Sequence, residues 1–194
     1  MKSHDLLCPA CGSRSRTRRL YSFLLNDHAL QGNLLHFSPS RSLYRTFKKL
    51  NSINYFSTDF ENEFVADYKI DIRKIDFEYS CFDTIICYHI LEHIEEDIIA
   101  MKELFRVLKP NGTCYLQTPF KGGTIYEDTT KITKSQRLQA FGQDDHVRIY
   151  SVQGLKKRLE QVGFKVSVKT FRPEQEDAYL GYRSPETVLI ASKS

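Results

Sequence analysis

The sequence has no tryptophan, only nine glycines and six prolines, and no apolar run of the length that crosses a bilayer. Its first residues lack the apolar core of a secretory signal, so we expect a cytoplasmic protein with no membrane partner. The five cysteines are an odd number and are scattered along the chain, which argues against a disulfide framework. A net charge of only +4 does not by itself indicate binding to nucleic acid.

The composition is that of a globular protein, with 41% hydrophobic and 27% charged residues among 194. This length suits one domain with a short appendage. We place the appendage at residues 1–31 and the domain at residues 32–194. The appendage carries a Cys-Pro-Ala-Cys sequence and four arginines. An amphipathic helix is predicted over residues 15–30, where apolar residues recur at helical spacing.

Strand and helix patterns alternate through the domain. Strands are predicted at residues 34–37, 53–58, 67–70, 82–88, 113–118, 164–171 and 187–192. Helices are predicted at residues 41–50, 91–109 and 151–162. This alternation predicts a mostly parallel α/β sheet with helices on both faces.

Ligands of such sheets bind beyond the carboxyl ends of the strands, so the residues that follow each strand are the first candidates for a site. Asp59 follows the second strand, about 20 residues after the first turn, where an acidic residue holds ribose hydroxyls in nucleotide-binding sheets. Asp71 follows the third strand, where a carboxylate can accept a hydrogen bond from an adenine amino group. Taken alone, each aspartate also fits a surface residue at a strand end.

The segment from Asp71 to Pro119 carries a more specific pattern. It has Leu-Glu-His at residues 91–93, after an apolar strand, and Arg-Val-Leu-Lys-Pro-Asn-Gly at residues 106–112, where the next helix is predicted to end. With this spacing the chain resembles class I S-adenosylmethionine-dependent methyltransferases. The resemblance implies a Rossmann-like, seven-stranded, mostly parallel sheet whose last strand is antiparallel.

The resemblance also implies that the cofactor, S-adenosylmethionine, lies across the tips of the first strands. On this basis we expect the cofactor-binding residues to be His36, Phe37, Ser38, Pro39, Asp59, Asp71, Ile72, Tyr88 and His89.

A narrower resemblance covers residues 8–192 and is to a small subfamily of methyltransferase-domain proteins that carry the cysteine pair and an Asp-His-Val-Arg-x-Tyr loop (here residues 145–150). The chain departs from the acidic-x-Gly-x-Gly loop of the wider family, because His36, Ser38 and Ser40 stand at those positions. Two hypotheses therefore remain open. The protein is a methyltransferase for a small or polar acceptor, or it is a degenerate methyltransferase fold that acts as a binding module without catalysis.

The spacing of Cys8 and Cys11 is that of a zinc knuckle, but a closed structural site requires four ligands. His4, His28 or a second subunit could complete such a site. We favour a turn without metal and expect no tightly bound zinc at this pair. The four arginines at positions 14, 16, 18 and 19 are interpreted as a solvated helix face rather than a phosphate patch, and nucleic acid is not an expected partner.

His89, His93 and His146 suggest either a metal or a general base. For His93 we expect a structural hydrogen bond to neighbouring backbone, and no metal ligand is assigned. The expected catalytic residues are His146, Asp145 and Tyr126, which would act as a base or position the acceptor. The long connection over residues 126–150 is predicted to form a lid over the cofactor, with His146 and Arg148 facing the acceptor. The sequence gives no indication of the oligomeric state.

Overall fold

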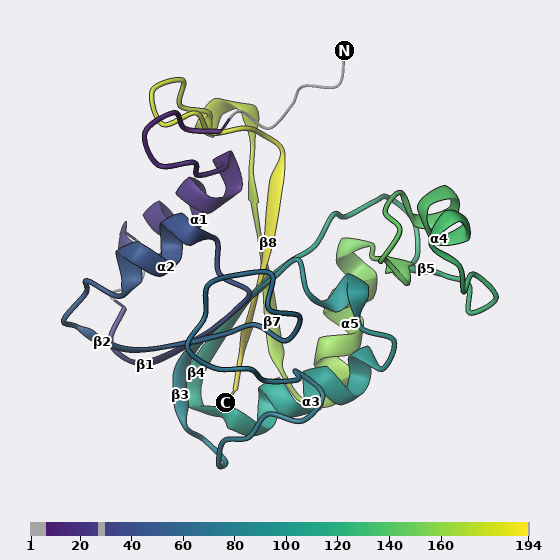
Figure 1. Ribbon diagram of the computed structural model, residues 1–194, viewed down its shortest axis with the longest axis horizontal. Coiled ribbons are helices and arrows are strands. Elements are labelled where there is room, and N and C mark those ends of the chain that lie inside the picture. The colour runs from purple at the N-terminus through teal and green to yellow at the C-terminus, as the bar shows by residue number, and fades with distance from the viewer. Residues whose placement is uncertain (1–6, 27–29, 194) are drawn as a thin grey trace.

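The computed structural model describes residues 7–26 and 30–193, which form a six-stranded sheet in the order β2-β1-β3-β4-β8-β7 (Figure 1). Strands β1 to β4 are parallel, and β8 is antiparallel to both of its neighbours, β4 and β7. The predicted mixed α/β sheet with an antiparallel last strand is therefore confirmed. The strands are β1 Gly32–Phe37, β2 Ile53–Thr58, β3 Phe82–Tyr88, β4 Leu108–Gln117, β7 Lys165–Phe171 and β8 Glu186–Ser192.

The seventh strand, expected at residues 67–70, is reduced to a single parallel bridge between Thr58 and Tyr68 in the described part of the chain. The amide N–H groups of Asp67 and Tyr68 both donate to the carbonyl of Ser57, which stops a regular ladder from forming. The Asp67 carboxylate also accepts a hydrogen bond from the Ser57 hydroxyl and pairs with Lys48. These local bonds hold the segment at the sheet edge without making it a strand.

Helices cover both faces of the sheet, as predicted (Figure 1). Helices α1 (Ser15–Asn26) and α2 (Arg41–Phe47) pack on one face, against Leu34, Ile86 and Tyr115. Helices α3 (Asp97–Val107) and α5 (Val152–Val162) pack on the other face, against Leu35, Ile85 and Leu116. Because neighbouring strand residues point to opposite faces, the two apolar clusters are separate cores on either side of one sheet.

The helix predicted over residues 91–109 is shorter at both ends. Residues Leu91–His93 form one turn of 3-10 helix, and α3 begins only at Asp97. Strand β4 follows α3 without a loop, because Leu108 adopts an extended backbone and pairs with Phe82. The register of this pair is irregular before Thr84 meets Thr113, and Pro110 lies in the irregular part, where its missing N–H costs no regular ladder bond.

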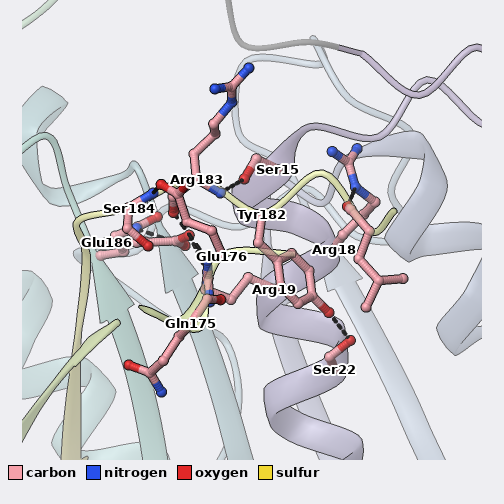
Figure 2. Close-up of polar contacts among 12 residues, drawn as sticks. Ser15, Arg18, Arg19, Ser22, Gln175, Glu176, Tyr182, Arg183, Ser184 and Glu186 are labelled. Carbon is pink, nitrogen blue, oxygen red and sulfur yellow. Dashed lines mark hydrogen bonds and ion pairs between the residues drawn. The ribbon is translucent and has the colours of Figure 1, made fainter. Parts of the chain in front are cut away.

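Helix α1 is fastened to the loop before β8 by buried arginine contacts (Figure 2). Arg19 is 4% exposed, pairs with Glu186 at 3.1 Å and lies between the rings of Phe171 and Tyr182. Arg18 donates to the carbonyl oxygens of Ser13, Leu180 and Gly181. The interpretation of these two arginines as a solvated helix face was wrong, because their partners lie about 160 residues away in sequence and no local pattern reveals them.

The long connection between β4 and α5 contains three elements that the sequence did not predict: β5 (Tyr126–Glu127), α4 (Lys134–Phe141) and β6 (Arg148–Ile149). The two short strands pair with each other, and the arm they form with α4 extends beyond α5 (Figure 1). A further single helical turn lies at Pro173–Gln175. Among the residues described, no helix has the length and apolar character to cross a membrane.

Arg148 does not face a cavity at the strand ends, contrary to the prediction. Its guanidinium donates to the carbonyl oxygens of Leu91, Ile94 and Glu95 and to the carboxylate of Glu127. Arg148 therefore pins the end of the arm to the turn that follows β3.

Candidate functional site

Two adjoining cavities open at the carboxyl ends of β1, β2 and β3, with volumes of about 240 and 430 Å³. They share Phe37, Ser38 and His93 as lining residues. The smaller cavity is lined by six apolar side chains and by polar and charged ones, among them the carboxylates of Asp59, Glu61, Asp71 and Glu95. Its apolar residues are Phe37, Phe60, Ile70, Ile72, Ile90 and Ile94.

Asp59 is buried at the end of β2, 6% exposed, and its carboxylate is already oriented. Oδ1 accepts the Ser38 hydroxyl at 2.6 Å, and Oδ2 accepts the backbone N–H groups of Glu63 and Phe64. Oδ1 thus retains one lone pair for a further donor on the cavity side. Asp59 therefore lines the cavity directly after the second strand, which is the position expected from the sequence.

Asp71 lines the same cavity but is engaged by its own neighbour. Arg73 donates from its guanidinium to both Asp71 oxygens, at 2.7 to 3.1 Å, and from its backbone N–H to Oδ1. Hydrogen bonds from Arg73 lower the pKa of the Asp71 carboxyl. A ligand amino group would have to compete with this bidentate pair, so Asp71 is the weaker of the two carboxylate candidates.

Two residues beside the cavities have a left-handed backbone, which costs a non-glycine residue about 1 kcal/mol or more. Ser38 has φ +45° and follows β1, while His89 has φ +56° and follows β3. Their N–H groups bond to the carbonyls of Thr58 and Gln117 on the neighbouring strands, which holds both turns in place. Ser38 thus adopts the conformation that a glycine of the family loop adopts without strain.

His36 stands at the position of the family's acidic residue. It is buried, 3% exposed, and is one of the residues that line the larger cavity. Its Nδ1 lies 3.1 Å from the Tyr55 hydroxyl, and the ring of Phe47 packs nearby. Burial lowers the pKa of His36 to about 3, so the ring is neutral at physiological pH. This position therefore provides no charge to a cofactor.

Near the carboxyl ends of the strands, several buried polar atoms have no hydrogen-bond partner within the described part of the chain. Tyr88 Oη, His89 Nε2 and both carboxylate oxygens of Glu92 belong to residues that line the larger cavity, Thr58 Oγ1 to a residue that lines the smaller one, and Gln117 Oε1 and Thr118 Oγ1 to the end of β4. Buried polar groups in folded proteins are nearly always satisfied, so such a concentration at one sheet edge indicates the seat of a polar ligand.

Glu92, His93 and His146 meet at one side of this cavity. Their ligand atoms, one per side chain, all lie within 4.8 Å of one another. The two imidazole rings stand edge to face with centroids 4.6 Å apart. Burial lowers the pKa of His146, and the nearby His93 adds to this effect. Nδ1 of His93 lies 2.9 Å from Oδ2 of Asp145, so the ring contacts a side-chain carboxylate and not the neighbouring backbone that was expected as its partner.

Of the predicted catalytic residues, His146 and Asp145 line the larger cavity and Tyr126 does not. Tyr126 lies in β5, half exposed, with its ring against Phe141. Pro39 is likewise absent from the lining of both cavities, whereas the other residues predicted to bind the cofactor line one of them. The rest of the predicted lid lies on the arm, and only Gln143, Asp145 and His146 reach the cavity.

Sequence reasoning considered His93 as a metal or base residue but assigned it no site role, and it missed Glu92 because that residue fell inside the predicted helix over residues 91–109. The signal that could have found Glu92 is its position shortly after a buried strand. Arg14, Arg16 and Thr17 of the N-terminal segment were missed as well, and they line the opposite side of the larger cavity.

The cysteine pair makes a tight turn in which the Gly12 N–H donates to the Cys8 carbonyl and the Cys8 N–H donates to the Ser13 carbonyl. Cys11 Sγ lies 3.1 Å from the Ser13 hydroxyl, and these contacts lower the pKa of the Cys11 thiol. His4 and His28, the suggested partners, lie outside the described residues. Cys87 and Cys114 are buried in the sheet and Cys81 precedes β3, so the expectation of no zinc at the pair stays a prediction.

An open α/β sheet with a cavity across the ends of its first strands is the architecture in which nucleotide-like ligands bind in other proteins. The sequence model of a family described as a methyltransferase domain matches residues 51–167, more than half of the chain. The chain therefore belongs to the methyltransferase-domain family. No curated protein matches the sequence.

Solved structures share the fold at low sequence identity. A SAM-dependent methyltransferase from Archaeoglobus fulgidus aligns with a TM-score of 0.66 and 14% identity, over 92% of this chain and 93% of that chain. Phosphoethanolamine N-methyltransferase 2 of Haemonchus contortus, in complex with S-adenosyl-L-methionine, aligns with a TM-score of 0.63 and 13% identity, over 92% of this chain and 52% of that one. The [4+2]-cyclase SpnF aligns with a TM-score of 0.63 and 16% identity, over 91% and 81% of the two chains.

Proposed function

We propose that the protein binds S-adenosylmethionine across the ends of β1, β2 and β3 and transfers its methyl group to a small or polar acceptor in the cytoplasm. The observation that carries the proposal is the larger cavity with unpartnered buried polar atoms on Tyr88, His89 and Glu92, next to a smaller, partly apolar cavity that is also lined by the buried Asp59. This pair of environments suits a ligand that has an apolar ring at one end and a charged amino acid at the other.

The adenosine half fits the smaller cavity. Ile70, Ile72 and Ile90 supply apolar walls for a flat ring. The free lone pair on Asp59 Oδ1 accepts a ribose hydroxyl, and Ser38 shares the same oxygen. A neutral donor to an ionised carboxylate contributes about 1.5–3 kcal/mol.

The methionine half fits the larger cavity, where Tyr88 and His89 offer unpartnered polar atoms. The cofactor supplies a methyl group on a cationic sulfur, a donor that needs no further activation. The chain's own residues therefore align the acceptor and exclude water. His146 and Asp145, at the mouth, are placed to orient the acceptor or to take its proton.

The rival hypothesis is a binding module without catalysis. It is motivated by Ser38 and His36, which replace a glycine and an acid of the family loop. The fold alone does not decide between the two, since the cyclase SpnF has the same fold. Ser38 already adopts the glycine-like conformation, so the loop geometry is kept, and this favours retained cofactor binding.

Titration calorimetry with S-adenosylmethionine and with its demethylated product tests the proposal. We expect a dissociation constant in the micromolar range for the wild type. Asp59→Asn should weaken binding about 10- to 150-fold, because it removes the charge that strengthens the ribose bond. Asp71→Asn is the matched control and should weaken binding less than threefold, since Arg73 already occupies that carboxylate.

No binding at millimolar cofactor would overturn the proposal and leave the binding module as the better account. Equal losses in the two variants would remove Asp59 from its assigned role. Methyl transfer itself is measured by formation of the demethylated product against a panel of small hydroxyl, amine and thiol acceptors, with a reaction without protein as the blank.

A further inference from the structure

We infer that Glu92, His93 and His146 form a binding site for one divalent transition-metal ion, with Zn²⁺ as the physiological candidate. The three residues bring two imidazole nitrogens and one carboxylate oxygen to one wall of the larger cavity. Imidazole and carboxylate together suit zinc and its neighbours in the first transition row, whereas Mg²⁺ and Ca²⁺ prefer oxygen ligands throughout.

Glu92 is the strongest argument for a cation. Its side chain is 2% exposed, and neither carboxylate oxygen has a hydrogen-bond partner in the described part of the chain. Nδ1 of His89 is 3.2 Å from Oε1, without hydrogen-bond alignment. An ionised carboxylate that is buried without partners costs several kcal/mol, and a bound cation removes this cost.

His93 lies beside the carboxylate of Asp145. Its Nδ1 is 2.9 Å from Oδ2 of Asp145, a close contact without hydrogen-bond alignment in the present side-chain positions. A carboxylate that accepts the second ring N–H is the usual outer partner of a metal-bound histidine. Asp145 is thus a positioning residue for His93.

The backbone around the cluster is fixed before any ion binds. The Val147 N–H donates to the Glu92 carbonyl at 2.9 Å, and Arg148 holds the carbonyls of Leu91 and Glu95. These bonds tie His146 to the turn that carries Glu92 and His93. Atoms bound to a tetrahedral zinc at about 2.1 Å stand about 3.4 Å apart, so the three side chains must rotate toward one another from the present spacing of up to 4.8 Å to complete the site.

Three protein ligands leave at least one coordination position open, which is the arrangement of a reactive rather than a closed structural zinc site. The open position faces the larger cavity, because all three ligands lie in its wall.

The test uses full-length protein without a histidine tag, carrying Cys8→Ser and Cys11→Ser so that the cysteine pair contributes no metal. We expect elemental analysis to find one Zn²⁺ per chain after loading and desalting. Co²⁺ as the probe should give visible d–d absorption without a thiolate charge-transfer band. Addition of azide should shift this absorption, since the ion has an open position.

Variants locate the ion. His93→Ala, His146→Ala and Glu92→Gln should each lose Co²⁺ binding or weaken it at least 100-fold. Asp145→Ala should weaken it 10- to 100-fold through His93. Asp144→Ala, the adjacent exposed aspartate, is the matched control and should leave Co²⁺ affinity unchanged.

Metal should also raise the unfolding temperature of the wild type and not that of His146→Ala, which separates binding from misfolding. The inference is overturned if the cysteine-free protein binds no metal, or if Glu92→Gln keeps Co²⁺ affinity. It is also overturned if Glu92→Gln loses affinity for S-adenosylmethionine while no metal binds, because Glu92 would then be a ligand of the cofactor. The metal measurements use no cofactor, so they stand whether or not the protein transfers methyl groups.

Discussion

At the scale of single residues, His36 links stability to pH. Burial lowers its pKa from 6.5 to about 3, so between these values the unfolded chain binds a proton at this position that the folded protein does not. Stability contributed by neutral His36 is complete above pH 6.5 and falls as the pH decreases, by about 1.4 kcal/mol per pH unit.

Urea unfolding at pH 7, 6 and 5 measures this effect. We expect the wild type to lose about 2 kcal/mol more between pH 6.5 and 5 than His36→Gln loses, because the variant has no titrating ring. The comparison between the two proteins cancels the other titrating groups. Parallel pH profiles would show that His36 is protonated in the folded protein.

Some residues of the candidate site could be predicted from the sequence, and others were missed. Asp59 could be predicted because strand order alone puts the residue after β2 at the ligand edge. Glu92 also follows a buried strand but was missed, since it lies within a run of apolar periodicity that continues into α3. Only the break in that helix after His93 leaves Glu92 at the cavity rather than on a helix face.

At the scale of elements, the contact between α1 and the loop before β8 depends on Arg19 (Figure 2). Burial raises the pKa of Glu186, although Arg19 and a hydrogen bond from Gln117 act to lower it. Arg19→Ala leaves this carboxylate buried without its cation and should cost about 3–5 kcal/mol of unfolding free energy. Arg19→Met combined with Glu186→Gln should cost less than Arg19→Ala alone, because no charge then remains to be buried.

Denaturant titrations of the single and double variants check this prediction. Arg18→Ala serves as the neighbouring control, and a loss smaller than that of Arg19→Ala is expected because its carbonyl partners lie near solvent. Equal stability of the wild type and Arg19→Ala would contradict the argument.

Helices and strands could be predicted from the sequence where their buried residues form a regular apolar pattern. The bounds of β2 and β3 agree with the sequence prediction residue for residue, because apolar runs enclosed by polar turns mark them. Helix α4 and strands β5 and β6 escaped prediction because they are short and α4 is largely exposed. A charge cluster of Glu127, Arg148 and Arg158 holds the arm, and such long-range pairs leave no periodic pattern.

At the scale of the whole molecule, α1 is one layer of the fold and not a detachable appendage. Leu20, Phe23 and Leu24 are buried on the sheet, and each contributes about 1.5–3 kcal/mol. Their combined contribution is comparable with the entire net stability of a domain, about 5–15 kcal/mol. We therefore expect a fragment of residues 32–194 to aggregate or to lack native circular dichroism.

Size-exclusion chromatography and near-ultraviolet dichroism of this fragment, beside the full chain, make the measurement. The full chain with Cys8→Ser and Cys11→Ser should keep its unfolding temperature, which separates loss of the helix from loss of the cysteine turn. A monomeric fragment with native dichroism would show that residues 32–194 fold independently.

The position of β8 between β4 and β7 has a consequence for biosynthesis. Both neighbours leave the ribosome before β8 does, so the nascent sheet has a gap where its last strand belongs. Roughly 70 residues separate β4 from β8, which at about 5–20 residues per second leaves the edge of β4 unpaired for several seconds. That edge includes the apolar residues Cys114, Tyr115 and Leu116, which can pair with another chain during this time. Translation that stalls before residue 186 would therefore release a protein whose ligand-binding strands are all made but whose sheet stays open.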